Sequence, residues 1–197
     1  MLDVRPVTGV IGAELSGVDL RRPIDGDTVT AIRGALLEHQ VIFFRDQDIT
    51  EEQQMRFAEC FGTPMLSVYD TLTAEQPKIT VLDTDAPKGR GTDRWHADHT
   101  FSDCPPLGAI LRAVEVPSSG GDTCFASAGA AYEALSPTLR AFLDTLTAIH
   151  TTGCCMGGCS PRRTTPVILA TMASTSSVVW MAVSVSRNAR SVGDSAS

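Results

Sequence analysis

The hydrophobic pattern near the start of the chain predicts two helices separated by a buried strand. The stretch DGDTVTAIRGALLEHQ places Val29, Ile32 and Leu36 at helical spacing behind a cluster of capping aspartates. The apolar run QVIFFRD that follows is typical of a short buried strand. DITEEQQMRFAECFGTP then predicts a second helix, because Thr50 and Gln53 fit a capping box and a Gly-Thr-Pro stop follows.

Strand signals dominate the centre of the chain, and a further helix follows them. KITVLDT and AILRAVEV have the composition of strands, and SSGGD is a glycine turn that leads into TCFAS. Ser136 and Pro137 fit the cap and first position of a helix. That helix is expected to carry four apolar residues on one face: Leu139, Phe142, Leu143 and Leu146. The order of elements predicts a strand-rich α+β fold with flanking helices.

Charge and composition change near residue 151. The first 150 residues have a net charge of −10, whereas residues 151–197 have a net charge of +3 with Asp194 as their one acid. SSVVWMAVSVS in this second part is rich in β-branched residues and predicts a strand, while the last ten residues have the composition of a disordered tail. We therefore divide the chain at 1–152 and 153–197. A frameshifted or truncated coding sequence would produce such a tail.

Composition favours one globular domain that acts on small molecules. Hydrophobic residues make up 43% of the chain and charged residues 20%, which is ordinary for such a domain. A net charge of −7 disfavours binding to nucleic acid or to a membrane surface, because both need a positive field. No signal peptide and no apolar run of about 18 residues is visible. We expect a cytoplasmic protein whose six cysteines are reduced thiols.

The stretch RWHADHTF contains the most specific candidate chemistry. In an extended strand His96 and Asp98 share one face, with Cα atoms about 6.6 Å apart, whereas His99 faces the other way. One imidazole and one carboxylate at this spacing are what a 2-His-1-carboxylate iron site takes from a single strand. Taken alone the pattern is short, and two exposed polar residues on a strand or loop are its plainer interpretation.

The surrounding sequence resembles the TauD/TfdA family of dioxygenases that depend on Fe(II) and 2-oxoglutarate. The resemblance rests on WHADHTFSDCPPLGAILRAVEVPSSGGDTCFAS, and upstream on GAELSGVDL and LLEHQVIFFRDQDITEEQQMRFAECFGTP. It covers approximately residues 4–152. It implies a double-stranded β-helix, or jelly roll, with added helices, of which this chain holds a truncated part. It also implies that 2-oxoglutarate and O2 are consumed, succinate is released, and a small anionic substrate such as taurine, another sulfonate, a sulfate ester or a carboxylate is hydroxylated.

The resemblance also implies roles for individual residues. His96 and Asp98 resemble the two iron ligands of the first strand, and Thr123 resembles the residue that hydrogen-bonds 2-oxoglutarate. Trp95 resembles the aromatic residue beside the metal. The candidates for contact with substrate are Tyr69, Asp70, Thr92 and Trp95.

The second histidine ligand and the arginine that pairs with 2-oxoglutarate are not identified in the chain. His39 is expected at the end of the first helix and His150 at the end of the last, and no histidine follows. A second hypothesis is therefore a non-catalytic relic or binding protein of the same family. Half a jelly roll leaves strand edges and an apolar face open, which favours aggregation or pairing with another copy of the chain.

We predict that the 197-residue chain turns over 2-oxoglutarate undetectably or far more slowly than a full-length relative. Two protein ligands hold iron less tightly than three, and an unassigned arginine removes a charge-assisted hydrogen bond of about 1.5–3 kcal/mol. Succinate release in the presence of Fe(II), ascorbate and O2 measures this. Robust release that is lost in both His96→Ala and Asp98→Ala would show that another residue completes the site.

Overall fold

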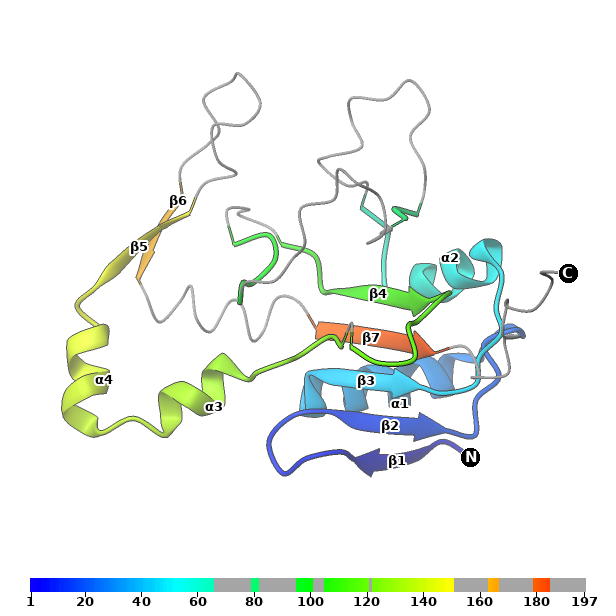
Figure 1. The fold of residues 1–197 in the computed structure, drawn as a ribbon, viewed down its shortest axis with the longest axis horizontal. Coiled ribbons are helices and arrows are strands. Elements are labelled where there is room, and N and C mark those ends of the chain that lie inside the picture. Colours follow the sequence, from blue (N-terminus) through cyan, green and yellow to red (C-terminus); the bar gives the residue numbers. More distant parts are fainter. Residues whose placement is uncertain are drawn as a thin grey trace, which may run out of the picture.

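The structure is a computed structural model, and the parts of the chain it describes assemble around one mixed sheet (Figure 1). The described residues are 1–65, 79–81, 95–100, 105–120, 122–150, 163–166 and 179–184. Within them the chain forms a five-stranded sheet, a two-stranded sheet and four helices. Helices together with a mixed sheet agree with the α+β class predicted from the sequence, while the jelly roll stays a prediction.

The first part of the chain alternates strands and helices as its pattern predicts. Its elements are β1 (Asp3–Pro6), β2 (Ala13–Ser16), α1 (Gly26–His39), β3 (Val41–Phe44) and α2 (Glu51–Glu59). Both predicted helices and the buried strand between them are confirmed. The short antiparallel hairpin β1–β2 lies in front of them.

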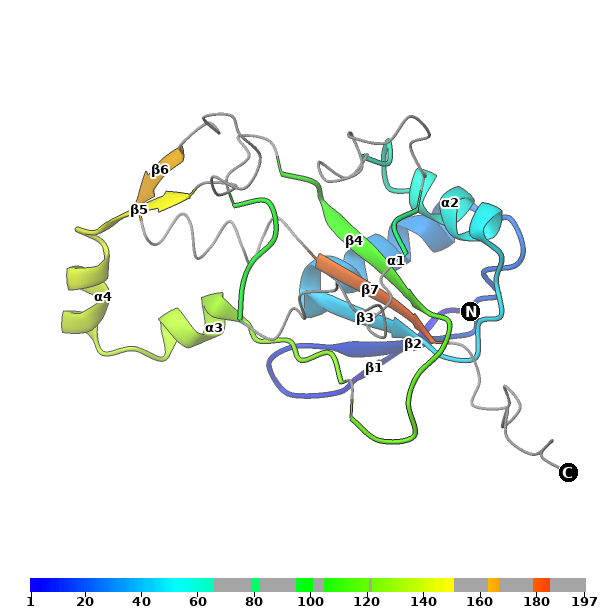
Figure 2. The ribbon, with the colours of Figure 1, turned by 45° about the horizontal axis from the view of Figure 1, so that its top comes forward.

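The later elements are shorter and more dispersed along the chain. They are β4 (Gly108–Ala113), α3 (Ala128–Glu133), α4 (Pro137–Leu143), β5 (Thr147–His150), β6 (Arg163–Pro166) and β7 (Val179–Ser184). In both views α3, α4 and the β5–β6 pair lie to one side of the larger sheet (Figure 1, Figure 2). No helix in the described ranges is long and apolar enough to cross a bilayer.

The larger sheet has the strand order β1-β2-β3-β7-β4. β1 runs antiparallel to β2, and the pairs β2–β3, β3–β7 and β7–β4 are parallel. β7 therefore joins the N-terminal strands to β4, and its register sets Met181 opposite both Ile42 and Ile110. The strand predicted for SSVVWMAVSVS is confirmed, while the boundary at residue 152 stays a prediction.

Two capping interactions fix where the first helices begin. Asp25 accepts a hydrogen bond from the Thr28 backbone at 2.8 Å, and this bond with that from the Thr28 hydroxyl holds the pKa of Asp25 below its ordinary value. Thr50 and Gln53 form the predicted capping box, with the Thr50 backbone donating to Gln53 Oε1 at 2.8 Å. Local sequence alone thus determines both helix starts.

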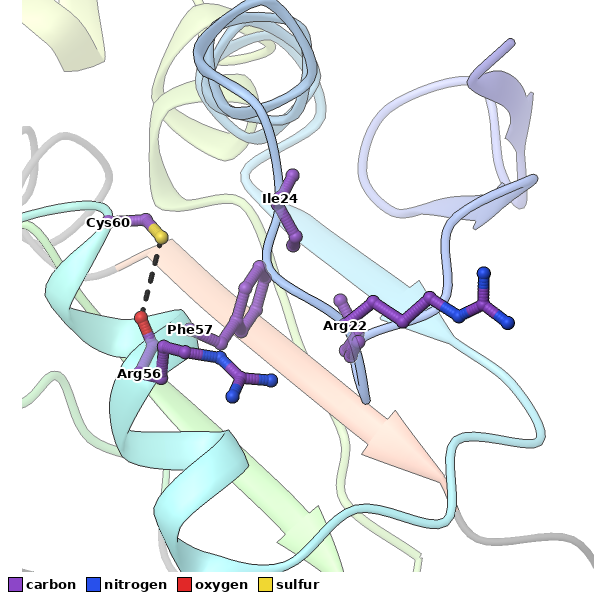
Figure 3. A pocket seen from close by; sticks show the side chains of 6 residues that line it. Arg22, Ile24, Arg56, Phe57 and Cys60 are labelled. Carbon is purple, nitrogen blue, oxygen red and sulfur yellow. Dashed lines mark hydrogen bonds between the residues drawn. The ribbon is translucent and has the colours of Figure 1, made fainter.

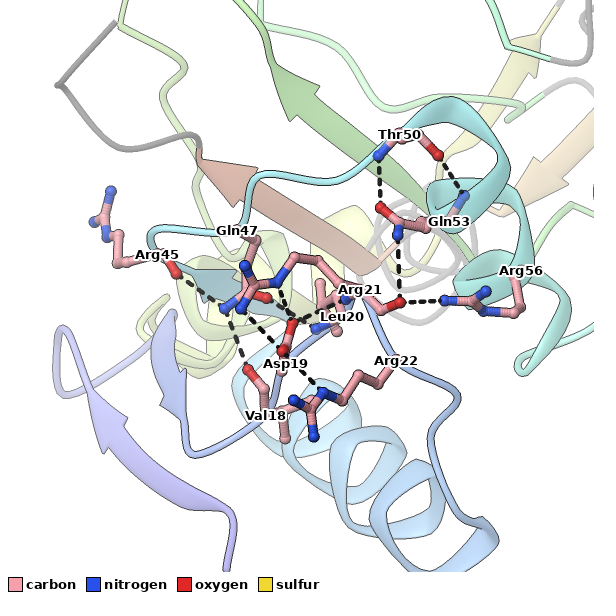
Figure 4. Close-up of polar contacts among 10 residues, drawn as sticks. All are labelled: Val18, Asp19, Leu20, Arg21, Arg22, Arg45, Gln47, Thr50, Gln53 and Arg56. Atoms are coloured by element: carbon pink, nitrogen blue, oxygen red, sulfur yellow. Dashed lines mark hydrogen bonds and ion pairs between the residues drawn. The ribbon is translucent and has the colours of Figure 1, made fainter.

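Polar contacts join the loop after β2 to helix α2 and to Gln47, which lies between β3 and α2 (Figure 4). The Gln47 side chain accepts from the Leu20 backbone at 2.9 Å and donates to the Val18 carbonyl at 3.2 Å. The Arg21 carbonyl accepts from Gln53 at 3.3 Å and from Arg56 at 2.8 Å. Backbone groups that no strand satisfies are therefore paired by side chains, which holds the loop over the core.

The core lies between the β2–β3 face of the sheet and the two long helices. Its buried side chains are Ala13, Leu15, Leu20, Ile32, Ala35, Leu36, Ile42, Phe44, Ile49 and Phe57. The rings of Phe44 and Phe57 meet edge to face with centroids 5.6 Å apart. Leu107 and Ile110 pack against the cluster and attach β4 to it.

Several sequence expectations are wrong in the later part. α4 ends at Leu143, so Leu146 lies beyond it and His150 ends β5 instead of a helix. The reason is that Thr147 and Ile149 are β-branched and alternate, and antiparallel pairing with β6 satisfies their backbone. α3, capped by Ser127, was not predicted, and Thr123 and its neighbours lie in no regular element.

The strand expected for KITVLDT is absent from its described residues, 79–81, and its other residues lie outside the described ranges. The apolar face of α4 is present but uncovered, because neither α3 nor α4 contains a buried residue. Phe142 on α4 is 57% exposed. Tight packing among the described residues is thus concentrated in the N-terminal elements.

Leu36 and Leu37 provide a matched test of the core. Leu36 is fully buried and Leu37, the next residue of α1, is 55% exposed. We predict that Leu36→Ala lowers the free energy of unfolding by about 2–5 kcal/mol, because it leaves a cavity. Leu37→Ala should lower it by less than about 0.5 kcal/mol. Urea unfolding of both variants measures the difference. Equal losses of stability in the two variants would contradict the assignment of Leu36 to the core.

Candidate functional site

His96 and Asp98 come together as the motif requires, although not on a strand. The His96 Nε2 and Asp98 Oδ1 atoms are 3.3 Å apart. Residues 95–97 lie in no regular element and residues 98–100 form a turn. His99 has a left-handed backbone with φ of 53°, which interrupts the extended alternation expected for the motif. The predicted strand is wrong, whereas the predicted convergence of the two side chains is confirmed.

The geometry of this pair fits two ligands of one metal ion. Two atoms each about 2.1 Å from an ion and at right angles to each other lie about 3.0 Å apart. The observed 3.3 Å is close to that value, and both side chains are open to solvent at 53% and 29% exposure. Imidazole and carboxylate are also the donors that non-haem iron takes. In the described ranges no group of three His, Cys, Asp or Glu side chains gathers to complete a site.

The other candidate residues are placed less completely. Trp95 precedes the pair and is 74% exposed. Thr123 is also exposed and lies in a stretch without helix or strand between β4 and α3. Tyr69, Asp70 and Thr92 lie outside the described residues. Cys60 and Cys124 are free and exposed thiols.

A charged cluster lies on β1, on β2 and at the residue that follows β3. Glu14 is paired with Arg5 and also with Arg45, whose Nε lies 2.8 Å from the Glu14 carboxylate. Hydrogen bonds from Arg5 and Arg45 lower the pKa of Glu14 below its ordinary value. Arg45 also lies over the ring of Phe43, with its Cζ atom 5.4 Å from the ring centroid. The positive charge of Arg45 is therefore already compensated by the Glu14 carboxylate.

One small hollow lies between the loop after β2 and helix α2 (Figure 3). Its lining consists of Leu20, Arg22, Ile24, Arg56, Phe57 and Cys60. The cavity volume of about 10 Å³ is enough for a single water molecule at most. This hollow is therefore too small to hold an organic substrate.

Comparison with known proteins identifies the family. The family model described as "Taurine catabolism dioxygenase TauD, TfdA family" matches residues 3–194. The chain belongs to the TauD/TfdA family. The match extends past residue 152, where the sequence alone predicted the resemblance to end.

Two curated relatives are at least 40% identical to the chain over the aligned residues. An alkylsulfatase of Acinetobacter baylyi is 40% identical over 158 residues, covering 80% of this chain and 49% of the relative. An alpha-ketoglutarate-dependent sulfate ester dioxygenase of Pseudomonas putida is 43% identical over 150 residues, covering 76% and 49%. The chain thus spans about half the length of the curated relatives it matches.

Solved structures agree with this assignment. A putative alpha-ketoglutarate-dependent taurine dioxygenase from Burkholderia xenovorans superposes with a TM-score of 0.70 at 35% identity, covering 85% of this chain and 60% of that one. A taurine dioxygenase from the same organism gives a TM-score of 0.70 at 37% identity, covering 84% and 58%. The fold of this chain is therefore similar to part of the fold of these two proteins.

Proposed function

We propose that this chain carries part of the active site of an Fe(II)- and 2-oxoglutarate-dependent dioxygenase that hydroxylates a small organic anion. Membership of the TauD/TfdA family supports the reaction class. The observation that carries the proposal is the 3.3 Å approach of His96 Nε2 to Asp98 Oδ1. Two side chains of the required donor types already converge there, in a solvent-accessible place.

His96 and Asp98 hold the metal in this proposal. The neutral His96 imidazole gives one nitrogen and the Asp98 carboxylate gives one oxygen, so the pair contributes one negative charge to the site. Bound Fe(II) would supply the positions at which 2-oxoglutarate and O2 react to oxidise a substrate C–H bond. A third ligand comes from outside this pair. The jelly roll that the resemblance implies is also part of the proposal.

Thr123 and Trp95 have supporting roles in the proposal. The Thr123 hydroxyl is exposed and makes no hydrogen bond to any described residue, so it is available to donate one to a 2-oxoglutarate carboxylate. Hydrogen bonds to charged groups are stronger than those between neutral groups. The 74% exposed indole of Trp95, next to His96, offers an apolar surface to the organic part of a substrate.

The names of the relatives support an anionic substrate. A sulfate ester is the substrate named for one relative, and phenoxypropionate is named for a 35% identical enzyme of Sphingobium herbicidovorans. Taurine is named for two structural neighbours. Sulfate esters, sulfonates and carboxylates share a small organic body with one anionic group. We infer that the substrate of this chain belongs to that class.

We predict that His96→Ala and Asp98→Asn each weaken Fe(II) binding at least about tenfold, the typical loss when a metal site is disturbed. His39→Ala, at the end of α1, is the matched control and should leave the affinity unchanged. Anaerobic titration with Fe(II) in the presence of 2-oxoglutarate measures this through the metal-to-ligand charge-transfer band. Asp98→Asn keeps the size of the side chain, removes its charge and replaces one carboxylate oxygen with an amide nitrogen.

Equal affinity in wild type, His96→Ala and Asp98→Asn would contradict the assignment of ligands. Absence of Fe(II) binding by the unsubstituted chain would favour the second hypothesis, a non-catalytic binding protein of the same family.

A further inference from the structure

The two faces of β3 differ in burial. Ile42 and Phe44 are buried in the core, at 0% and 1% exposure, because alternate residues of a strand point to the same side. Phe43 lies between them and is only partly buried. It therefore belongs to the opposite face of the sheet, away from α1 and α2.

The Phe43 ring contacts a segment that is distant in sequence. The rings of Phe43 and Phe125 have centroids 6.3 Å apart and planes at 70°, an edge-to-face pair. Phe43 itself is confined, since Arg45 lies over its ring and its edge lies within 3.5 Å of the place where a Cβ on Gly12 would stand. A fixed ring on the sheet thus meets a ring from the stretch between β4 and α3.

Most of that stretch is exposed to solvent. Every described residue from 114 to 126 is exposed except Phe125. The stretch becomes fixed again at Ser127, which is buried and caps α3 by accepting a hydrogen bond from the Ala130 backbone at 3.2 Å. Thr123 lies only two residues before Phe125. Its position therefore depends on where the Phe125 ring is held.

We propose that Phe125, seated against Phe43, is the positioning residue that holds Thr123 for 2-oxoglutarate. The inference rests on the proposed function for its ligand and on the ring contact for its mechanism. Phe125 touches neither metal nor co-substrate in this account. It limits the conformations of the Thr123 backbone before the ligand arrives, so that less conformational freedom is lost on binding. Removal of the ring should weaken 2-oxoglutarate binding while Fe(II) binding by His96 and Asp98 is retained.

The ring contact is tested first, without any ligand. The chain contains seven phenylalanines, so fluorinated phenylalanine gives seven ¹⁹F signals, and loss of one signal in Phe125→Tyr assigns Phe125. Phe43→Leu keeps an apolar side chain in the sheet and should shift the Phe125 signal. Phe142→Leu, on the exposed face of α4, is the control and should leave that signal in place. A Phe125 signal that ignores Phe43→Leu would overturn the proposal.

The consequence for the ligand is tested next on the Fe(II)-loaded chain without oxygen. Phe125→Ala and Phe43→Leu should weaken 2-oxoglutarate binding roughly tenfold, measured by the charge-transfer band, and leave Fe(II) affinity, measured against a chelator, unchanged. Phe125→Tyr retains a ring and should restore 2-oxoglutarate binding, and Phe142→Leu should have no effect.

Two outcomes separate this inference from the proposed function. Normal 2-oxoglutarate affinity in Phe125→Ala would overturn the positioning role and leave the dioxygenase proposal intact. Absence of 2-oxoglutarate binding in the unsubstituted chain would contradict the dioxygenase proposal and the positioning role together, even where the ¹⁹F signals establish the ring contact.

Discussion

Burial of the apolar face of β2 and β3 under α1 and α2 is the interaction on which the described structure depends. The fully buried hydrophobic side chains among the described residues lie between Ala13 and Phe57. Alternation in the strands and helical spacing in α1 bring Leu15, Ile32 and Phe44 into one cluster. Each such side chain contributes about 1.5–3 kcal/mol when removed from water, so this region has the stability to position whatever attaches to it.

Among the described residues, β4 is attached to that core through its pairing with β7 and through several side-chain contacts. β4 is joined through Ile110, which packs on the cluster, and through Arg112, which donates to the Ile49 carbonyl. Gln54 of α2 donates to the Ile110 carbonyl at 3.4 Å. Segments with few buried contacts open locally at low cost, and binding loops are commonly of this kind. His96, Asp98 and Thr123 lie in segments without helix or strand, and the ring pair of Phe43 and Phe125 joins one of these segments to the sheet.

The sequence was informative where local interactions decide the structure. The caps Asp25 and Thr50 and the helical spacing of α1 are encoded within a few residues, and both helices were predicted with the strand between them. The convergence of His96 and Asp98 was expected from the alternation of an extended strand, whereas the structure brings the two side chains together at the start of a turn. The left-handed backbone of His99 was not predicted, because no glycine marks that position.

Features that depend on distant partners were missed or misplaced. His150 was assigned to a helix because Leu139, Phe142 and Leu146 are spaced as in one, yet pairing with β6 makes it the end of a strand. In the sequence Phe43 is one of several apolar residues in a predicted buried strand. The structure shows that its ring contacts the ring of Phe125, which is distant in sequence. Tertiary contacts override local propensity at such positions.

The ligand role of His96 is most directly tested by X-ray absorption at the iron edge of the Fe(II)-loaded chain. The account predicts imidazole scattering in the wild-type spectrum that disappears in His96→Ala, because the Nε2 atom beside Asp98 is then gone. An imidazole contribution that is unchanged in His96→Ala would contradict it and would show that another histidine binds the metal.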